Sequence, residues 1–302
     1  MPLYLLHFTL PATALRLPEP PCNVQSWRGR LSQQETESSS LSPPARSPRV
    51  SCATRGAAMS AAKKPIPPRP AVSSPTSTSS THHSTSFLTS VSPLNLALVI
   101  LNVEHLRTDV PQFGAAARFT HLWRQSSLRL CADGAANRLH DSLDETARAR
   151  MLPDLITGDL DSLRGDVATF YSELGVPIEA EADQDTHDFE KCLRWLERRQ
   201  LADAAGAGSG GAAASRPFSV VAVGAFGGRL DQQMANLNMA YAFSAFERFY
   251  LMSDSSIAFV LPPGKHVIEA NAEAEDGSCG LIPLGGRCDR VVTTGCAHAR
   301  ES

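Results

Sequence analysis

The chain has 302 residues and a formal net charge of −3, from 28 Lys and Arg residues against 31 Asp and Glu residues. This slightly acidic balance, without a basic patch interleaved with aromatic residues, argues against nucleic acid as a partner. No apolar run is long enough to cross a bilayer, so we expect no membrane partner. The seven cysteines form no C-x-x-C pair, which argues against structural zinc and suits a reducing compartment.

Residues 1–93 are rich in Ser, Pro and Thr and show no sustained hydrophobic period, which predicts a disordered amino-terminal extension. The extension contains more basic than acidic residues. That composition is also typical of an organelle transit peptide, and translation from Met59 would omit most of it. We expect a cytoplasmic protein, with organelle targeting as the alternative.

Apolar strands alternate with helical patterns between residues 94 and 252. Each predicted strand is a short aliphatic or β-branched run that leads through a turn into a segment of helical period. The strands cover residues 96–101, 128–132, 155–157 and 218–223. This alternation predicts an α/β domain with a parallel sheet, whose ligands bind at the carboxyl ends of the strands.

The helical period is absent after residue 252. Two apolar runs, at residues 256–261 and 265–269, flank a Pro-Pro-Gly turn and predict a hairpin. Two more short strands are expected at residues 279–282 and 290–294. Residues 253–302 are therefore predicted to begin an antiparallel β-sandwich domain.

The first acidic motif lies directly after the predicted strand 155–157. Asp159 and Asp161 are two residues apart in extended chain, so their carboxylates point to the same side. Paired carboxylates at the end of a strand are oxygen ligands of the kind that Mg²⁺ prefers. The alternative is that Asp161 and Ser162 only cap a helix over residues 163–174.

The second acidic motif precedes another predicted helix. Thr186 can cap this helix, and its apolar residues recur with the spacing of one buried face. Asp185 and Asp188 lie at its start, and Lys191 places a cation beside them. Carboxylates at this position also favour the helix dipole, which is the simpler explanation. Together the two acidic motifs predict a site for Mg²⁺ and a polyphosphate.

Two glycine turns follow predicted strands. The turn at residues 133–137 has small residues that leave backbone N–H groups open to an anion, although an ordinary Asp-Gly turn would look the same. The turn at residues 224–231 contains several glycines, and then Arg229 and Asp231. Arg229 can bind two phosphate oxygens, and Asp231 can orient it or bind a metal.

Seven motifs follow one another in the chain: C-A-D-G-A-A-N-R-L (131–139), G-D-L-D-S (158–162), D-Q-D-T-H-D-F-E-K (183–191), G-G-R-L-D-Q (227–232), L-P-P-G-K-H (261–266), C-G-L-I-P-L-G (279–285) and V-T-T-G (292–295). In this order they resemble the motifs of eukaryotic thiamine pyrophosphokinases. The resemblance implies an α/β catalytic domain joined to a β-sandwich, in a homodimer that binds ATP and thiamine. It also implies Mg²⁺-dependent transfer of a diphosphoryl group from ATP to the thiamine hydroxyl, which releases AMP.

The resemblance further implies roles for particular residues. The implied catalytic residues are Asp159, Asp161, Asp188, Arg229 and Asp231. The implied metal ligands are Asp159, Asp161 and Asp185. The implied ATP-binding residues are Asp133, Gly134, Asn137, Gln184, Lys191, Gly227 and Gly228. The chain departs from the family at His187 and Glu190, where relatives commonly have Thr.

The family pattern continues after Gly295 with a Leu-x-Trp segment and further strands, whereas this chain ends at Ser302. We therefore expect an incomplete sandwich that binds thiamine poorly. Two other functions remain open at this point. One is a nucleotide-sugar glycosyltransferase with a metal on Asp159-x-Asp161, which leaves the Gly-Gly-Arg-x-Asp turn unexplained. The other is a catalytically silent binding homologue.

Overall fold

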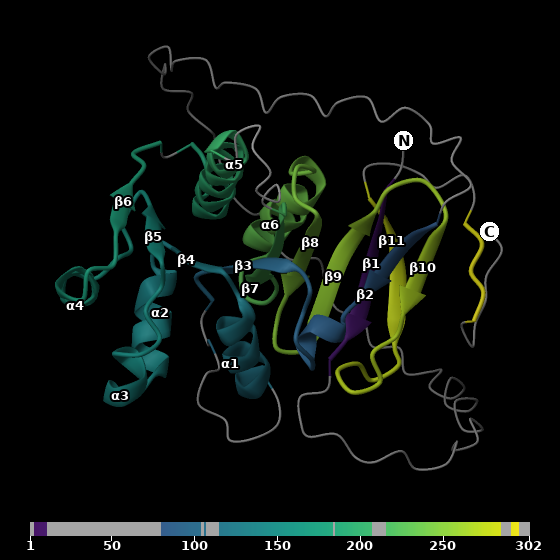
Figure 1. Cartoon of the computed structure of the whole chain (residues 1–302), viewed down its shortest axis with the longest axis horizontal. Coiled ribbons are helices and arrows are strands. Elements are labelled where there is room, and N and C mark those ends of the chain that lie inside the picture. Colours follow the sequence, from purple (N-terminus) through teal and green to yellow (C-terminus); the bar gives the residue numbers. More distant parts are fainter. Residues whose placement is uncertain are drawn as a thin grey trace, which may run out of the picture. The chain divides into compact units, whose positions relative to one another are not determined.

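The computed structural model describes residues 3–10, 80–103, 106, 115–183, 185–206, 216–284 and 291–295. All of these residues fall in one compact unit. Their strands form one mixed sheet of nine strands and one separate pair, and helices cover the parallel part of the sheet (Figure 1).

Six parallel strands lie side by side in the order β6-β5-β4-β3-β7-β8. Their bounds are Asn95–Ile100 (β3), Leu128–Ala132 (β4), Leu155–Gly158 (β5), Ile178–Ala180 (β6), Phe218–Val223 (β7) and Arg248–Met252 (β8). The four strands predicted from apolar runs are β3, β4, β5 and β7. The α/β prediction is therefore confirmed.

The order of these strands reverses at β3. From β3 the chain adds β4, β5 and β6 on one side, and then crosses to add β7 and β8 on the other side. In sheets of this kind the reversal leaves a crevice at the carboxyl ends of the strands, where ligands bind. The carboxyl ends of β3, β4, β5 and β7 are thus the expected place for a site.

Two layers of helices bury the two faces of the sheet. Along β3, Leu96 and Leu98 join one apolar cluster, whereas Ala97 and Val99 join the other, because successive side chains point to opposite faces. The first cluster contains residues of α1 (Ala115–Gln125), α2 (Ala135–Ser142) and α4 (Gly165–Glu173), and the second contains residues of α5 (Asp188–Gly206) and α6 (Leu230–Ala242). Figure 1 shows α5 and α6 above the strands and α1 and α2 below them. A short helix, α3 (Glu145–Arg148), follows α2. No helix in the described ranges is long and apolar enough to cross a membrane.

Helix α4 does not begin as predicted by the alternative in which Asp161 and Ser162 cap it. The cap residue of this helix is Arg164, and its side chain makes no capping hydrogen bond. Asp161 and Ser162 therefore do not cap the helix. Their carboxylate and hydroxyl bond to each other instead, with Ser162 Oγ donating to Asp161 Oδ1 at 2.9 Å.

Antiparallel strands continue the sheet beyond β8. Strand β9 (Ser256–Leu261) pairs with β8, β1 (Leu3–Thr9) pairs with β9, and β11 (Cys279–Leu284) pairs with β1. Antiparallel strands were predicted for the carboxyl-terminal part, and they are present. They extend the parallel sheet, and a domain boundary at residue 253 stays a prediction.

The predicted hairpin is wrong. Strand β10 (His266–Glu269) does not pair with β9 but runs parallel to β2 (Thr81–Ser84), in a two-stranded sheet of its own. Strand β9 already has a neighbour on each edge, β8 on one and β1 on the other, so it has no open edge for β10. Residues 291–295 carry only an isolated bridge at Val292 where a strand was expected.

Two short parts of the amino-terminal extension form regular structure, contrary to the expectation for residues 1–93. They are β1 and β2, and a 3-10 turn (Ser86–Leu88) follows β2. Leu5, Leu6 and Phe8 are buried, which gives β1 the apolar contacts that a polar extension lacks. Residues 11–79, with the Ser- and Pro-rich runs, lie outside the described residues.

Candidate active site

Three carboxylates meet where two neighbouring parallel strands end. Asp133 follows β4, Asp159 follows β5, and Asp188 opens α5. One oxygen from each side chain lies within 4.8 Å of the others. Three anions at this distance repel one another unless a cation or protons neutralise them. Oxygen-only anionic ligands are the donor set that Mg²⁺ and Ca²⁺ take.

Gly158, the last residue of β5, makes this approach possible. A Cβ atom on this residue would lie 2.6 Å from Cβ of Asp133 and 3.0 Å from Oδ1 of Asp188. Asp133 itself has a left-handed backbone conformation, with φ 45°. Non-glycine residues rarely adopt this conformation, and such residues cluster at functional sites. Gly158 and the backbone conformation of Asp133 therefore allow the side chains of Asp133 and Asp188 to lie close together.

Asp133 is the most buried of the three aspartates, with 2% of its surface exposed. Its Oδ2 accepts a hydrogen bond from the backbone N–H of Ser162 at 3.1 Å, whereas its Oδ1 is buried and has no hydrogen-bond partner. Burial raises the pKa of this carboxyl, and the charge of Asp188 raises it further. A buried oxygen without a partner is costly, and a bound cation would satisfy it.

Lys191 is the cation inside the site. Its side chain is fully buried on α5, and its Nζ lies 2.9 Å from Oδ1 of Asp188 and 3.8 Å from Oδ2 of Asp159. The spacing of three residues from Asp188 places both groups on one side of the helix. Lys191 therefore offsets part of the negative charge of the cluster and holds two of its carboxylates in place.

The loop after β5 is tied to both β4 and α2. Leu160 has φ 63°, and the backbone N–H of Asp161 donates to Oδ1 of Asp159 at 3.3 Å. Asn137 of α2 donates to the carbonyl of Ser162 at 2.7 Å and accepts from the backbone N–H of Arg164 at 3.1 Å. Asn137 thus positions this loop, and both the nitrogen and the oxygen of its side-chain amide form hydrogen bonds within the protein.

The second glycine turn lines a cleft of about 370 Å³ at the ends of β7 and β8. Gly227 and Gly228 have φ of 102° and 74°, conformations that side chains rarely allow. The other walls come from Val103 and Leu106 after β3, from Arg118 and Phe119 of α1, and from residues 252–256, which run from the end of β8 to the start of β9. Beside this turn Arg229 Nε donates to Oδ1 of Asp231 at 3.1 Å, and both side chains are exposed. The hydrogen bond from Arg229 lowers the pKa of Asp231.

The structure brings together some of the sequence-predicted residues and separates others. Asp133, predicted to bind ATP, joins Asp159 and Asp188 in the carboxylate cluster, beside Lys191. The predicted metal ligands Asp161 and Asp185 lie outside that cluster, and their role stays a prediction. Asp231 at the second glycine turn is not part of the carboxylate cluster either. Gln184 lies outside the described residues.

One neighbour of the site was missed by sequence reasoning. Asn102 follows β3, and its Oδ1 accepts a hydrogen bond from Nε of Arg138 at 3.1 Å. A Cβ atom on Gly134 would lie 2.6 Å from Nδ2 of Asn102, so the two residues are in close contact. A polar residue directly after an apolar strand was the available signal. Thr186 was predicted to cap the helix that follows it. In the structure its hydroxyl donates a hydrogen bond to Oδ2 of Asp183 at 2.5 Å.

The fold and the site together define an α/β protein with a doubly wound sheet. A cluster of carboxylates that can hold a cation lies at the ends of its parallel strands. Comparison with known proteins makes this more specific. Residues 119–251 match the family model described as thiamin pyrophosphokinase, catalytic domain.

The relatives agree with the family model. Thiamine pyrophosphokinase 1 of Oryza sativa subsp. japonica is 37% identical over 209 residues, which cover 66% of this chain and 71% of the relative. Thiamine pyrophosphokinase 1 of Arabidopsis thaliana is 36% identical over 227 residues, which cover 70% and 77%. The crystal structure of yeast thiamin pyrophosphokinase superposes with a TM-score of 0.50 at 29% identity, over 63% of this chain and 68% of that one. The chain belongs to the thiamine pyrophosphokinase family.

Proposed function

We propose that this chain transfers a diphosphoryl group from ATP to the hydroxyl of thiamine, giving thiamine diphosphate and AMP. The relatives that carry this activity in their names support the proposal, as does the family model. The observation that carries it in this chain is the cluster of Asp133, Asp159 and Asp188, with its unpartnered buried oxygen. The relatives and the yeast structure described above are thiamine pyrophosphokinases, which favours this reaction over that of a glycosyltransferase.

Mg²⁺ is the proposed cofactor. Asp133, Asp159 and Asp188 would hold it, and Asp161 and Asp185 of the two acidic motifs are further candidates as ligands. When bound, the ion neutralises phosphate charge and aligns the reacting groups, which is most of what phosphoryl transfer requires from a protein. The orphaned Oδ1 of Asp133 and the missing Cβ of Gly158 support this fit.

The remaining groups have roles that follow from their positions. Lys191 fixes the carboxylates of Asp159 and Asp188, so that they do not reorganise when a ligand binds. The positive φ of Gly227 and Gly228 lets backbone come close to a phosphate, and Arg229 can bind two of its oxygens. The cleft beside this turn is the proposed place for the organic part of a substrate.

We propose a cytoplasmic homodimer, since the family resemblance implies that thiamine and ATP meet between subunits. We further propose that residues 94–252 form the catalytic domain and that residues 253–302 belong to the thiamine-binding part. Sedimentation equilibrium tests the dimer directly, because a monomeric mass at assay concentrations would contradict it.

The test of the function compares two substitutions on the same helix. Asp188→Asn keeps the shape of the side chain and removes a charge from the cluster. Asp203→Asn makes the same change at the other end of α5, where Asp203 pairs with Arg199 at 3.0 Å. We expect Asp188→Asn to lower kcat by about 100-fold or more, as the loss of one charge-stabilising group does, and Asp203→Asn to have no effect on kcat.

Product analysis gives the outcome that would contradict the proposal. The wild-type chain, supplied with ATP, thiamine and Mg²⁺, should form thiamine diphosphate and AMP in equal amounts. A chain that binds Mg²⁺ and ATP but forms neither product is a silent homologue. Stabilisation by a nucleotide sugar, with none by ATP, in a Mg²⁺-containing thermal shift assay would favour the glycosyltransferase.

A further inference from the structure

Strand β1 occupies a slot between two strands from the opposite end of the sequence. Its residues pair antiparallel with β11 on one side, from Leu3↔Leu284 to Phe8↔Cys279. On the other side they pair antiparallel with β9, from Tyr4↔Leu261 to Thr9↔Ser256. Among the described strands β11 has no other neighbour. Strand β1 is therefore the link that joins β11 to the sheet.

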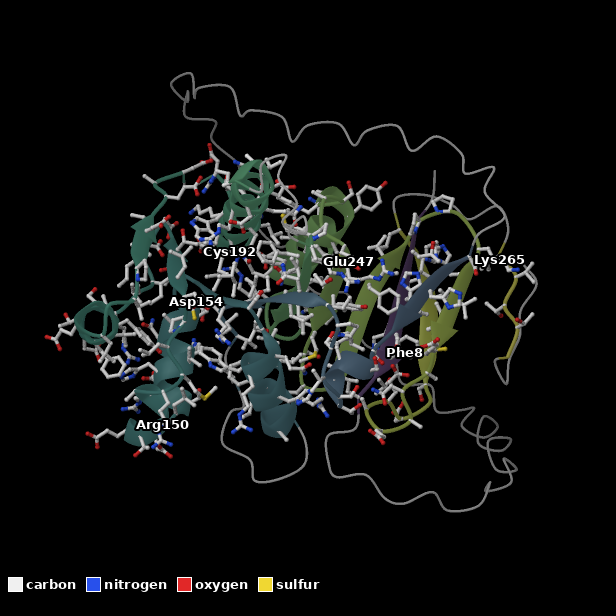
Figure 2. All side chains as sticks on the ribbon, viewed as in Figure 1. Phe8, Arg150, Asp154, Cys192, Glu247 and Lys265 are labelled. Carbon is white, nitrogen blue, oxygen red and sulfur yellow. The ribbon has the colours of Figure 1, made fainter. Side chains whose placement is uncertain are left out.

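Side chains on both faces of β1 are buried. Leu6, Phe8 and Leu10 alternate along the strand and enter the larger apolar cluster, where the ring centroids of Phe8 and Phe259 are 6.3 Å apart. Leu5 points to the opposite face and is 4% exposed. Figure 2 shows Phe8 among these strands. The strand thus has the burial of a core strand, although it lies at the start of the chain.

The carboxyl end of β1 holds two turns together. The backbone N–H of Leu10 donates to the carbonyl of Ser255 at 2.8 Å, and that of Thr9 donates to the carbonyl of Ser278 at 3.1 Å. The carbonyl of Thr9 accepts from the backbone N–H of Asp276 at 3.1 Å. Because Ser255 also lines the cleft beside the second glycine turn, β1 supports one wall of that cleft.

We propose that the slot between β9 and β11 is a strand-binding groove, and that residues 3–10 of this chain are its specific, separable occupant. Strand β9 begins at Ser256 and β11 at Cys279, far from β1 in the sequence, so no short turn joins β1 to either neighbour. Ladder pairing and apolar packing hold β1 in the slot. A strand added to a sheet gains affinity from main-chain hydrogen bonds and specificity from pockets for alternate side chains, here those of Leu6 and Phe8.

The test uses the full chain, with a protease recognition sequence inserted between residues 11 and 79. After cleavage, the amino-terminal fragment should stay with the rest of the protein in gel filtration. A fluorescent peptide of residues 1–11, added in excess, should exchange into the groove and increase its anisotropy. These readouts report binding and mass only, so they do not depend on the proposed enzymatic function.

Two altered peptides test the specificity. Replacement of both core residues, Leu6→Asp with Phe8→Asp, should weaken binding by about 100-fold or more, because carboxylates would enter an apolar cluster. The control His7→Gln changes a half-buried residue whose Nε2 lies 3.0 Å from Oγ of Ser256, and it should bind within about threefold of the parent peptide.

Three results would overturn the proposal. One is separation of the fragment after cleavage with no change in the Tm of the remainder. Another is equal binding of the parent peptide and the doubly substituted peptide. The third is a fall of the protein's mass to one half on addition of excess peptide, because the slot would then be filled by β1 of a second copy.

Discussion

Replacement of Gly158 by alanine is the sharpest perturbation of the carboxylate cluster. The new Cβ atom would lie 2.6 Å from Cβ of Asp133, whereas ordinary contacts of this kind begin at 3.4 Å. The neighbouring atom belongs to the base of a side chain, so no rotation of Asp133 relieves the contact. The backbone of β4 or β5 has to move, and Asp133 and Asp188 move with it.

The difference between these two distances sets the expected loss of stability and activity. About 0.8 Å of displacement is needed, which is comparable to overpacking by a methyl group and costs about 1–3 kcal/mol of stability. A misplacement of about 1 Å in a catalytic group costs about 100-fold in rate. We therefore expect Gly158→Ala to unfold at lower urea concentration and to lose about 100-fold in kcat/KM.

Gly165→Ala is the matched control. Gly165 is the first residue of α4, and a Cβ atom there meets nothing within 4 Å. Alanine at such a position is expected to stabilise the protein by about 0.4–1 kcal/mol through the unfolded chain, with activity unchanged. Urea unfolding and ATP–thiamine turnover are measured for both variants. Near wild-type activity of Gly158→Ala would show that the close approach at this glycine does not position the carboxylates.

Three further predictions concern charged and titratable groups. Lys191→Met should lower the free energy of unfolding by about 2 kcal/mol in EDTA, which is less than for a fully buried pair because the aspartate partners of Lys191 are partly exposed. Mg²⁺ should restore part of the lost stability. An unchanged urea midpoint would contradict the prediction. Arg229→Lys should lower kcat/KM by about 10-fold or more, because lysine offers one point charge where arginine binds two oxygens; full activity would place Arg229 outside the site. His83 has its pKa lowered by burial to about 4, with the nearby His266 and Arg248 adding to the effect. The unfolded chain then binds more protons between pH 4 and 6.5, so urea stability should rise across this window and level off above it, whereas His83→Leu should flatten the rise.

Four of the six parallel strands were predictable because each of them carries its own signal, whereas β6 and β8 were not predicted. A strand buried on both faces is a continuous apolar run, as in residues 218–223, and the helix after it has a separate period. Strands β1 and β2 could not be placed from such a local signal. Their partners β9, β11 and β10 are distant in sequence, and nothing within Leu3–Thr9 indicates where it pairs.

The candidate site shows the same division. Asp159 and Asp188 were found because they lie at the ends of recognisable elements, and such ends meet at one edge of a parallel sheet. That Asp133 joins them depends on β4 and β5 being neighbours and on the left-handed backbone at Asp133, neither of which a single sequence displays. Lys191 was predicted beside the acids, but its complete burial was not.

The most direct measurement follows the β-phosphate of ATP. The purified chain is incubated with thiamine, Mg²⁺ and ATP labelled at its β-phosphate, and the products are separated. Transfer of a diphosphoryl group predicts that all transferred label is in thiamine diphosphate and that an equal amount of unlabelled AMP forms. Asp188→Asn should form both products about 100-fold more slowly or slower still. Labelled ADP together with unlabelled thiamine monophosphate, or no thiamine phosphate at all, would contradict the proposed reaction.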